Sequence, residues 1–380
     1  MRIGEDIKSL FQEIRDIRRE LHKIPEIGFD LYKTQSYVLD KLLECKPDSM
    51  RKIAKTGIKA VFLCEGAEET IAFRADMDAL NNFETSDIPY RSTHDGKMHG
   101  CGHDGHTAIL LGLAKIIAQN REKLNKNVVL LFQPGEEGFA GARRMIEEGA
   151  LQNPTVDKIY GLHLWPNVPK NKIGIRWDYL MAQNSDFKVT VKGKSTHAST
   201  PQLGVDAIVA AAEFINLLQS VITRNVDPHQ DALLTLGTIN GGTSHNVIAD
   251  FVEISGTLRV FNGELYDILK TRISAVLEGL KVATGAEFEM TENVHYPCVM
   301  NPRDMVEDFY KYLDSMEDTH LVEPVMAAED FAEYQLEVPG IFFFLGIGEE
   351  GATPLHSTNF NFDEEVLLTG IEVFKRILGI

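Results

Sequence analysis

The sequence predicts an α/β protein with a largely parallel sheet and a smaller α+β domain inserted into it. Three observations predict this. Apolar strand-like runs alternate with helical segments up to residue 180, the pattern changes near Met181, and the last stretch returns to the first pattern. Alternating strands and helices are typical of parallel sheets covered by helices. We therefore expect one domain over residues 1–180 and 294–380, and an inserted domain over residues 181–293.

The first domain begins with an amphipathic helix, because apolar residues recur every three or four positions from Ile7 to Leu21. Pro25 is expected to end this helix. Next we expect a helix at 34–44, strands at 59–64 and 70–74, a helix at 107–117, a strand at 127–132, a helix at 143–148 and a strand at 159–164. The closing stretch adds a helix at 305–313, a strand at 341–345 and a helix at 364–378.

The inserted domain has a different order of elements. We expect strands at 186–191, 232–238, 251–260 and 287–291, with helices at 205–223 and 265–283. This is the β-α-β-β-α-β order of ferredoxin-like domains.

Composition excludes several classes of function. The chain has 38 basic and 56 acidic residues, a formal net charge of −18, which repels nucleic-acid phosphates and anionic membranes. Its four cysteines are far apart, which favours a reducing compartment over a disulfide framework. The charged N-terminus does not fit a signal peptide, and no apolar run reaches about 18 residues. We expect a cytoplasmic protein that binds neither nucleic acid nor membrane.

A glycine-rich segment over residues 98–106 gathers metal-ligand residue types. It contains Cys101, His103, Asp104 and His106 within six positions. Thiolate and imidazole are good ligands for zinc-like ions. Taken alone, the segment also fits a glycine-rich turn that begins the next helix.

Further ligand types lie at or beyond the ends of the predicted strands. These are Asp76 and Asp78, Glu136 and Glu137, His163, and His356. Sites in open α/β sheets form outside the carboxyl ends of the strands. Each residue alone has a structural explanation, but their shared edge favours a metal site.

The adjacent glutamates suggest a division of roles. Consecutive side chains of an extended segment point to opposite sides, so one carboxylate can bind metal while the other accepts a proton from water. This combination hydrolyses amides without a covalent intermediate. The sequence has no GxSxG elbow, no GxGxxG fingerprint and no Walker loop, which argues against a serine hydrolase or a nucleotide-binding enzyme.

Eight sequence motifs together resemble the M20 metallopeptidase family, in its amidohydrolase branch. In order they are RADMDAL, MHGCGHDGH, LLFQPGEEG, GLHLWP, GKSTHASTP, GTINGGTSHNVIAD, AAEDFAEY and PLHSTNF, across residues 74–360. That branch includes aminoacylases, hippurate hydrolases, N-acetyl-diaminopimelate deacetylases and hydrolases of auxin conjugates. The resemblance implies a zinc-exopeptidase-like catalytic domain with an inserted lid domain that forms a homodimer.

The resemblance also implies roles for individual residues. The implied metal ligands are Cys101, His103, Glu137, His163 and His356, with Cys101 shared between two divalent ions. Glu136 is the implied general base, and Asp76 or Asp78 orients a ligand, Asp78 being favoured by its spacing. His197 is the implied oxyanion donor in the partner's site, while Asn246 and Arg259 are implied to bind the carboxylate side of the substrate. Zinc, manganese, cobalt and nickel all stay open, because a thiolate changes metal preference.

The implied activity is removal of an N-acyl group from an N-acyl amino acid by attack of a metal-bound hydroxide. A dipeptidase of the same family is the alternative, and an inactive metal-binding scaffold is a third. The retained Glu136 argues against the scaffold. The acyl group and the amino acid stay open, since Asn81 and Ala249 stand where the family usually has proline.

Overall fold

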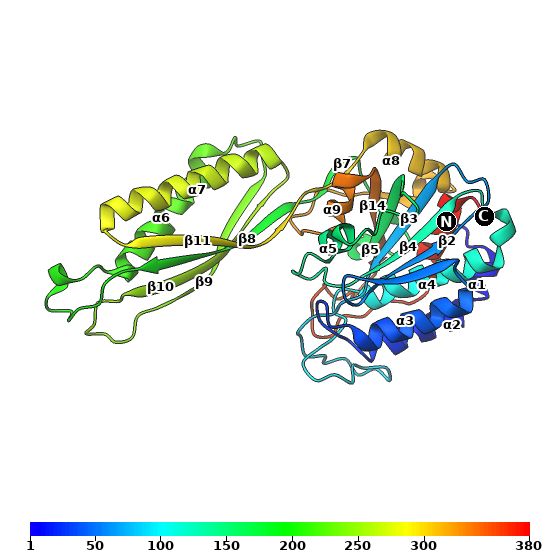
Figure 1. The fold of residues 1–380 in the computed structure, drawn as a ribbon, viewed down its shortest axis with the longest axis horizontal. Helices are drawn as coiled ribbons and strands as arrows, with labels where there is room; N and C mark the ends of the chain where they lie inside the picture. Colours follow the sequence, from blue (N-terminus) through cyan, green and yellow to red (C-terminus); the bar gives the residue numbers. More distant parts are fainter. The chain divides into compact units, whose positions relative to one another are not determined.

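The computed structural model describes the backbone of residues 1–380 and the side chains of all but residues 293 and 294. The chain forms two compact units (Figure 1). Unit 1 comprises residues 1–180, 299–323 and 330–380, and unit 2 comprises residues 181–298 and 324–329.

Unit 1 is built on an eight-stranded mixed sheet in the order β1-β2-β4-β3-β5-β14-β6-β13. The four central strands, β4, β3, β5 and β14, are mutually parallel. The strands are β1 (Ser49–Ile53), β2 (Gly57–Phe62), β3 (Thr70–Asp76), β4 (Asn127–Gln133), β5 (Lys158–Pro169), β6 (Ile173–Ile175), β13 (Thr319–Leu321) and β14 (Gly340–Gly348). A separate pair joins β7 (Asp178–Met181) to β12 (Val299–Asn301). The predicted α/β class with a mixed, mostly parallel sheet is confirmed.

Helices cover the sheet of unit 1. They are α1 (Glu5–Lys8), α2 (Phe11–His22), α3 (Tyr32–Cys45), α4 (His103–Gln119), α5 (Gly141–Glu147), α8 (Arg303–Phe309), α9 (Phe331–Glu337) and α10 (Val366–Leu378). Neighbouring phenylalanines of β14 show the two faces: Phe342 contacts Phe331 of α9, whereas Phe343 contacts Phe374 of α10. The predicted first helix is divided between α1 and α2.

The core of unit 1 positions the ends of its central strands. Every residue of β3 is buried, and α4 packs on β3 with apolar side chains on all sides of the helix. Because β3 and β4 are parallel and in register, Asp76 and Gln133 lie side by side at their carboxyl ends. The segments that follow these strands, residues 77–80 and 134–140, therefore leave the sheet at the same edge.

Unit 2 has the element order β-α-β-β-α-β. Its elements are β8 (Gln183–Lys192), α6 (Ala207–Asn225), β9 (Ala232–Gly241), β10 (Phe251–Val260), α7 (Gly263–Thr284) and β11 (Glu287–Tyr296). The antiparallel sheet has the order β11-β8-β10-β9, with both helices packed on one face (Figure 1). The inner face contributes Phe187, Val189 and Val191 to a separate core.

Helix α6 is long and apolar enough to cross a membrane by length and composition alone. In the structure, its Phe214, Leu218 and Val221 pack into the core of unit 2, while Glu213 and Gln219 lie on the exposed side. This amphipathic arrangement is typical of a core helix in a globular domain.

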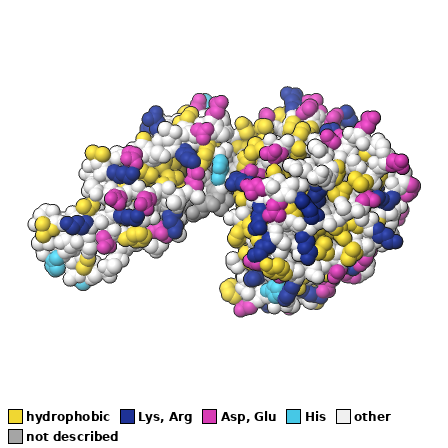
Figure 2. All heavy atoms as spheres, in the orientation of Figure 1, with side chains coloured by type: hydrophobic (Ala, Val, Ile, Leu, Met, Phe, Trp, Pro, Cys, Tyr) yellow, Lys and Arg dark blue, Asp and Glu magenta, His cyan; other side chains and the backbone are white. Residues whose placement is uncertain are grey.

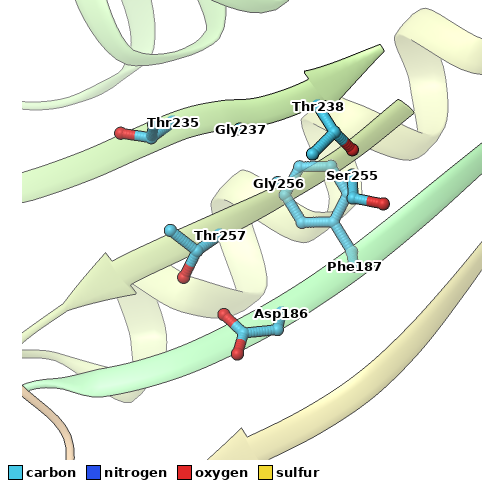
Figure 3. A pocket seen from close by; sticks show the side chains of 8 residues that line it. All are labelled: Asp186, Phe187, Thr235, Gly237, Thr238, Ser255, Gly256 and Thr257. Carbon is cyan, nitrogen blue, oxygen red and sulfur yellow. The ribbon is translucent and has the colours of Figure 1, made fainter. Parts of the chain in front are cut away.

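A pocket of about 290 Å³ opens on the sheet of unit 2, near the bulge at Ser255 and Gly256 (Figure 3). Hydroxyl groups and the carboxylate of Asp186 line it, over the ring of Phe187. The lining has no imidazole or thiol, so it does not offer the ligand types that the sequence motifs predict.

Candidate metal centre

The predicted ligands of unit 1 converge on the thiol of Cys101. Its Sγ lies 3.4 Å from His163 Nε2 and 3.3 Å from His356 Nε2. Two sets of possible ligands share this sulfur. The first set adds His103 and His163, and the second adds Glu137 and His356. Within each set the ligand atoms lie within 4.8 Å of one another. A sulfur between two such sets is the geometry expected of a ligand shared by two ions.

Two polar atoms at this point have no hydrogen-bond partner among the described residues. They are His103 Nε2 and Glu137 Oε1, both buried and 4.0 Å apart. A buried polar atom without a partner costs about 1–3 kcal/mol. Both are atoms that ligate divalent cations, so the residues fit a metal ion.

Hydrogen bonds on the far nitrogens orient the two buried ligand histidines. His103 Nδ1 donates to the carbonyl oxygen of Asp78 at 2.9 Å, and His163 Nδ1 donates to the carbonyl oxygen of Leu164 at 2.8 Å. In its neutral form, which is the form that binds metal, each ring then carries its lone pair on Nε2, which faces the site. Such outer hydrogen bonds fix the tautomer and orientation of metal-binding histidines.

Asp78 holds the Glu136–Glu137 pair as well. Its Oδ1 accepts from the backbone N–H of Glu136 at 3.1 Å, and its Oδ2 accepts from that of Glu137 at 3.0 Å. The preceding Gly135 has φ +72°, a left-handed conformation that favours glycine. Asp78 therefore fixes both the glutamate pair and His103.

Asp76 has a different set of partners. It accepts from His106 Nδ1 and from Arg74 Nη1, both at 2.6 Å, and the backbone N–H of Leu164 donates to His106 Nε2 at 2.9 Å. His106 is therefore a neutral imidazole that joins β3 to β5 beside His163. Burial opposes the charged form of Asp76, but the charges of His103 and Arg74 and the hydrogen bond from His106 hold its pKa well below the usual range.

Arg74 and Asp330 were not singled out by sequence reasoning. Arg74 Nη2 donates to Asp330 Oδ1 at 2.7 Å, and both side chains are buried. Asp330 also accepts from the side chain of Gln133 and from the backbone of Ala142. A charged residue inside the apolar run of β3 was the available signal, because a buried arginine needs carboxylate partners.

The charge balance of the site favours a cation. Burial and the charges of Glu137 and Glu136 raise the pKa of the Cys101 thiol well above its usual range. Burial opposes protonation of His103, but Asp76, Asp78 and Glu137 raise its pKa to about 10. Without a metal the site therefore retains protons on these groups. A divalent cation would replace them, because a coordinating thiol is deprotonated.

His356 lies in the loop after β14 and is the most exposed candidate ligand, with 54% of its side chain accessible. Its backbone has φ +65°, an uncommon conformation for a residue with a side chain. Two hydrogen bonds hold it there: its N–H donates to Gly100 O at 2.7 Å, and Asn82 Nδ2 donates to its carbonyl at 2.9 Å.

The remaining predicted site residues belong to unit 2, in two separate places. His197 and Asn246 lie together, because Ala198 N donates to Asn246 O at 3.0 Å and His197 pairs with Val247. Arg259 lies near the far end of β10, where its Nη1 donates to Met326 O at 2.6 Å. Unit 2 thus brings His197 and Asn246 together but not Arg259.

Comparison with known proteins identifies the family. Residues 72–379 match Peptidase family M20/M25/M40. The chain is 36% identical to the N-acetyldiaminopimelate deacetylase of Halalkalibacterium halodurans, covering 94% of this chain and 96% of that protein. It is 37% identical to the N-acetyl-L-cysteine deacetylase of Bacillus subtilis, covering 98% and 90%.

A solved structure agrees with these relatives. The YXEP protein of Bacillus subtilis, a dinuclear metal-binding peptidase of the M20 family, superimposes with a TM-score of 0.83 at 32% identity, covering 98% of each chain. The chain therefore belongs to the M20/M25/M40 peptidase family, as its motifs predicted. Its class is that of an amide-bond hydrolase.

Proposed function

We propose that this protein removes the acyl group from an N-acyl amino acid in a metal-dependent hydrolysis. The observation that carries the proposal is the convergence of Cys101, His103, Glu137, His163 and His356 beside a second glutamate, Glu136. Two relatives of the chain are named as deacetylases of N-acetylated amino acids, which supports the substrate class.

Two divalent ions held by these five ligands would lower the pKa of a bound water and polarise the amide carbonyl. Glu136 accepts the proton of the attacking water and passes it to the leaving amine. The backbone contact between Glu136 and Asp78 keeps the segment fixed while the proton moves. The dinuclear M20 relative supports two ions, with zinc, manganese, cobalt or nickel as the candidates.

A substrate panel tests the proposed function. The purified protein is stripped with a chelator, reloaded with each candidate metal, and incubated with N-acetyl, N-benzoyl and longer N-acyl amino acids beside plain dipeptides. Release of the free amino acid is measured by chromatography, with Glu136→Gln as the control. Hydrolysis of N-acyl amino acids is expected. Cleavage of dipeptides only would establish the dipeptidase, and no cleavage by metal-loaded protein would establish the inactive scaffold.

We also propose that unit 2 is the lid and supplies an oxyanion donor. The side chain of His197 is exposed, and the backbone N–H of Ser199 donates to its Nδ1 at 3.1 Å. An imidazole that accepts at Nδ1 carries its proton on Nε2. That N–H would donate to the carbonyl oxygen of the substrate as negative charge develops there.

The length of β10 supports a contribution from two subunits. His197 and Asn246 adjoin the Phe251 end of this strand, whereas Arg259 is eight residues further along, a separation of about 27 Å. A small amino-acid derivative cannot span that distance. If all three residues act on substrate, one lid must serve two sites, which is the arrangement of a homodimer with His197 acting in the partner's site.

Strand β9 provides a surface for such a dimer. Among the described strands it pairs only with β10, and it exposes Leu233 and Ile239. The neighbouring helix α6 exposes Ile208 and Val209. An unpaired strand edge beside apolar side chains is suited to pairing with a second copy about a two-fold axis. A cytoplasmic location and the lack of nucleic-acid and membrane partners stay predictions.

A further inference from the structure

A second group of charged side chains lies buried behind the metal centre. It consists of Arg18, His22, Glu84 and Asp104, each at most 4% exposed. Most charged side chains are spread over the surface, where acidic and basic groups alternate (Figure 2). Buried charges are costly unless they are paired, so this group has a structural or a functional reason.

His22 connects the two carboxylates of the group. Its Nδ1 donates to Asp104 Oδ2 at 2.7 Å, and its Nε2 lies 3.3 Å from Glu84 Oε1. Burial opposes the charged imidazole, but the Asp104 charge outweighs burial and the nearby Arg18, so the pKa of His22 is raised. A carboxylate oxygen thus lies at each ring nitrogen, an arrangement that favours the imidazolium form, which donates from both nitrogens.

Arg18 completes the charge balance one helical turn earlier. Its Nε lies 2.8 Å from Asp104 Oδ2, and its Nη1 donates to Glu364 at 3.2 Å. Its guanidinium also lies over the ring of Phe362. Both basic residues come from α2, which contains none of the proposed ligands.

Asp104 directs these contacts to the first turn of α4. Three side chains of that turn are hydrogen-bonded to other segments. His103 bonds to Asp78 O, Asp104 bonds to His22, and His106 bonds to Asp76. Their partners lie in three different segments of unit 1, namely the loop after β3, helix α2 and strand β3. Cys101 lies two residues before the helix, so the orientation of the turn sets the positions of two candidate ligands.

Glu84 connects His22 to the loop that contacts the segment of His356. It lies in the loop after β3, and the adjacent Thr85 N–H donates to Thr358 O at 2.7 Å. Asn82 of the same loop donates to His356 O. This loop therefore holds the segment that carries His356.

We propose that His22 is a positioning residue for the metal centre, joining the segment of Cys101 and His103 to the loop that supports His356. This inference rests on the proposed function, because it requires that these residues bind metal. One segment carries the shared Cys101 and His103 of the first set, and the other holds His356 of the second set, so His22 controls the separation between His103 and His356.

The test compares His22→Gln with Arg19→Gln in the full chain. Arg19 is the matched control, since it lies on α2 and pairs with Glu364, and within the described part of the chain no hydrogen bond or ion pair joins it to Asp104. Metal-free protein is titrated with Zn²⁺ against a chromophoric chelator. His22→Gln is expected to weaken Zn²⁺ binding about 10- to 100-fold, the usual effect of losing such a support, while Arg19→Gln stays within about twofold of wild type.

A second readout uses the metal-free protein. The amides of Gly105 and His106 both donate to Gly102 O, and they should exchange hydrogen faster in His22→Gln than in Arg19→Gln. Wild-type Zn²⁺ affinity in a folded His22→Gln would overturn the inference and leave the proposed function standing. Lack of Zn²⁺ binding by wild type would overturn both. If His22→Gln does not fold, Glu84→Gln removes one acceptor, and its unchanged Zn²⁺ affinity would overturn the inference.

Discussion

The first turn of α4 and the loop at 193–201 both present candidate catalytic histidines, but they hold them differently. His103 and His106 are buried, and each is bonded to a fixed group of a neighbouring strand or loop. His197 is exposed, and among the described residues its ring is hydrogen-bonded to Ser199 of its own loop. Unit 1 therefore fixes its histidines through contacts with other segments, whereas unit 2 leaves the ring of His197 accessible, as its proposed role requires.

Metal removal should have the largest effect, and it separates the two regions. Treatment with a strong chelator is expected to abolish hydrolysis, because the ligands of unit 1 carry the chemistry. The circular dichroism spectrum should be retained, since the apolar cores of both units are built from residues other than the five candidate ligands. Activity that persists in protein shown to be metal-free by elemental analysis would contradict the proposed mechanism.

Removing the proposed base should come next. Glu136→Gln is expected to lower kcat by about 10²- to 10⁴-fold, the usual contribution of general acid–base catalysis. The amide keeps the shape and polarity of the side chain, so bound metal should be unchanged by elemental analysis. If Glu136→Gln instead loses metal, and the sites that stay loaded turn over at the wild-type kcat, the roles of Glu136 and Glu137 are exchanged.

His197→Ala tests the exposed region. We expect a loss of about 10²- to 10³-fold in kcat, the usual effect of removing one oxyanion donor. Metal content and thermal stability should stay at wild-type values, because this exposed side chain contacts only its own loop in the described structure.

The same variant tests whether His197 acts in the partner's site. Mixing His197→Ala chains with Glu136→Gln chains should restore activity, because a mixed dimer has one site with both groups intact. If subunit exchange is verified by mass spectrometry and activity does not return, His197 acts within its own chain or outside catalysis.

Glu137→Gln should lower the affinity of the protein for its metal ions. Glu137 Oε1 lies 3.3 Å from His356 Nε2 and belongs to the second set of possible ligands. Loss of an outer support of a metal ligand usually lowers metal affinity at least about tenfold, and replacing this carboxylate should weaken binding by at least as much. Competition with a chelator measures it, and an affinity equal to wild type would remove Glu137 from the ligand set.

The smallest expected effect is on assembly. Ile239→Lys places a charge on the exposed edge strand β9 and should shift the protein toward monomer in sedimentation experiments. Val282→Lys is the control, since Val282 is 90% exposed on α7 of the same unit and away from that edge. Equal sedimentation of both variants and wild type as monomers would argue against the dimer.

The sequence predicted the central part of unit 1 well, because its strands are continuous apolar runs. Strand β4 ends at Gln133, one residue beyond the expected strand, before Pro134. The prediction was less accurate at β5, which runs from Lys158 to Pro169 rather than 159–164, so His163 lies in the middle of the strand and not at its end. Residues after Leu164 lack the apolar pattern, and pairing with β14 keeps them extended.

Other features depend on contacts that a linear pattern does not contain. Residues 324–329 return to unit 2, where Ala182 N lies within hydrogen-bonding distance of the carbonyls of Val325 and Ala327. Only the fold shows that His22 lies between two carboxylates 62 and 82 positions away in sequence. The motifs predicted the candidate ligands and an orienting aspartate, Asp76 or Asp78, but not the contacts that Arg18 and His22 make with Asp104.

The contacts of α2 have a practical consequence for defining the catalytic unit. The family match begins at residue 72, yet Arg18 and His22 bond to the helix that follows Cys101. A fragment trimmed to the family match would retain all five candidate ligands and lose the charges that neutralise Asp104. Without those basic partners, the buried carboxylate of Asp104 would carry an unpaired charge next to His103. A minimal enzyme must therefore retain the first 22 residues to preserve the geometry of its metal centre.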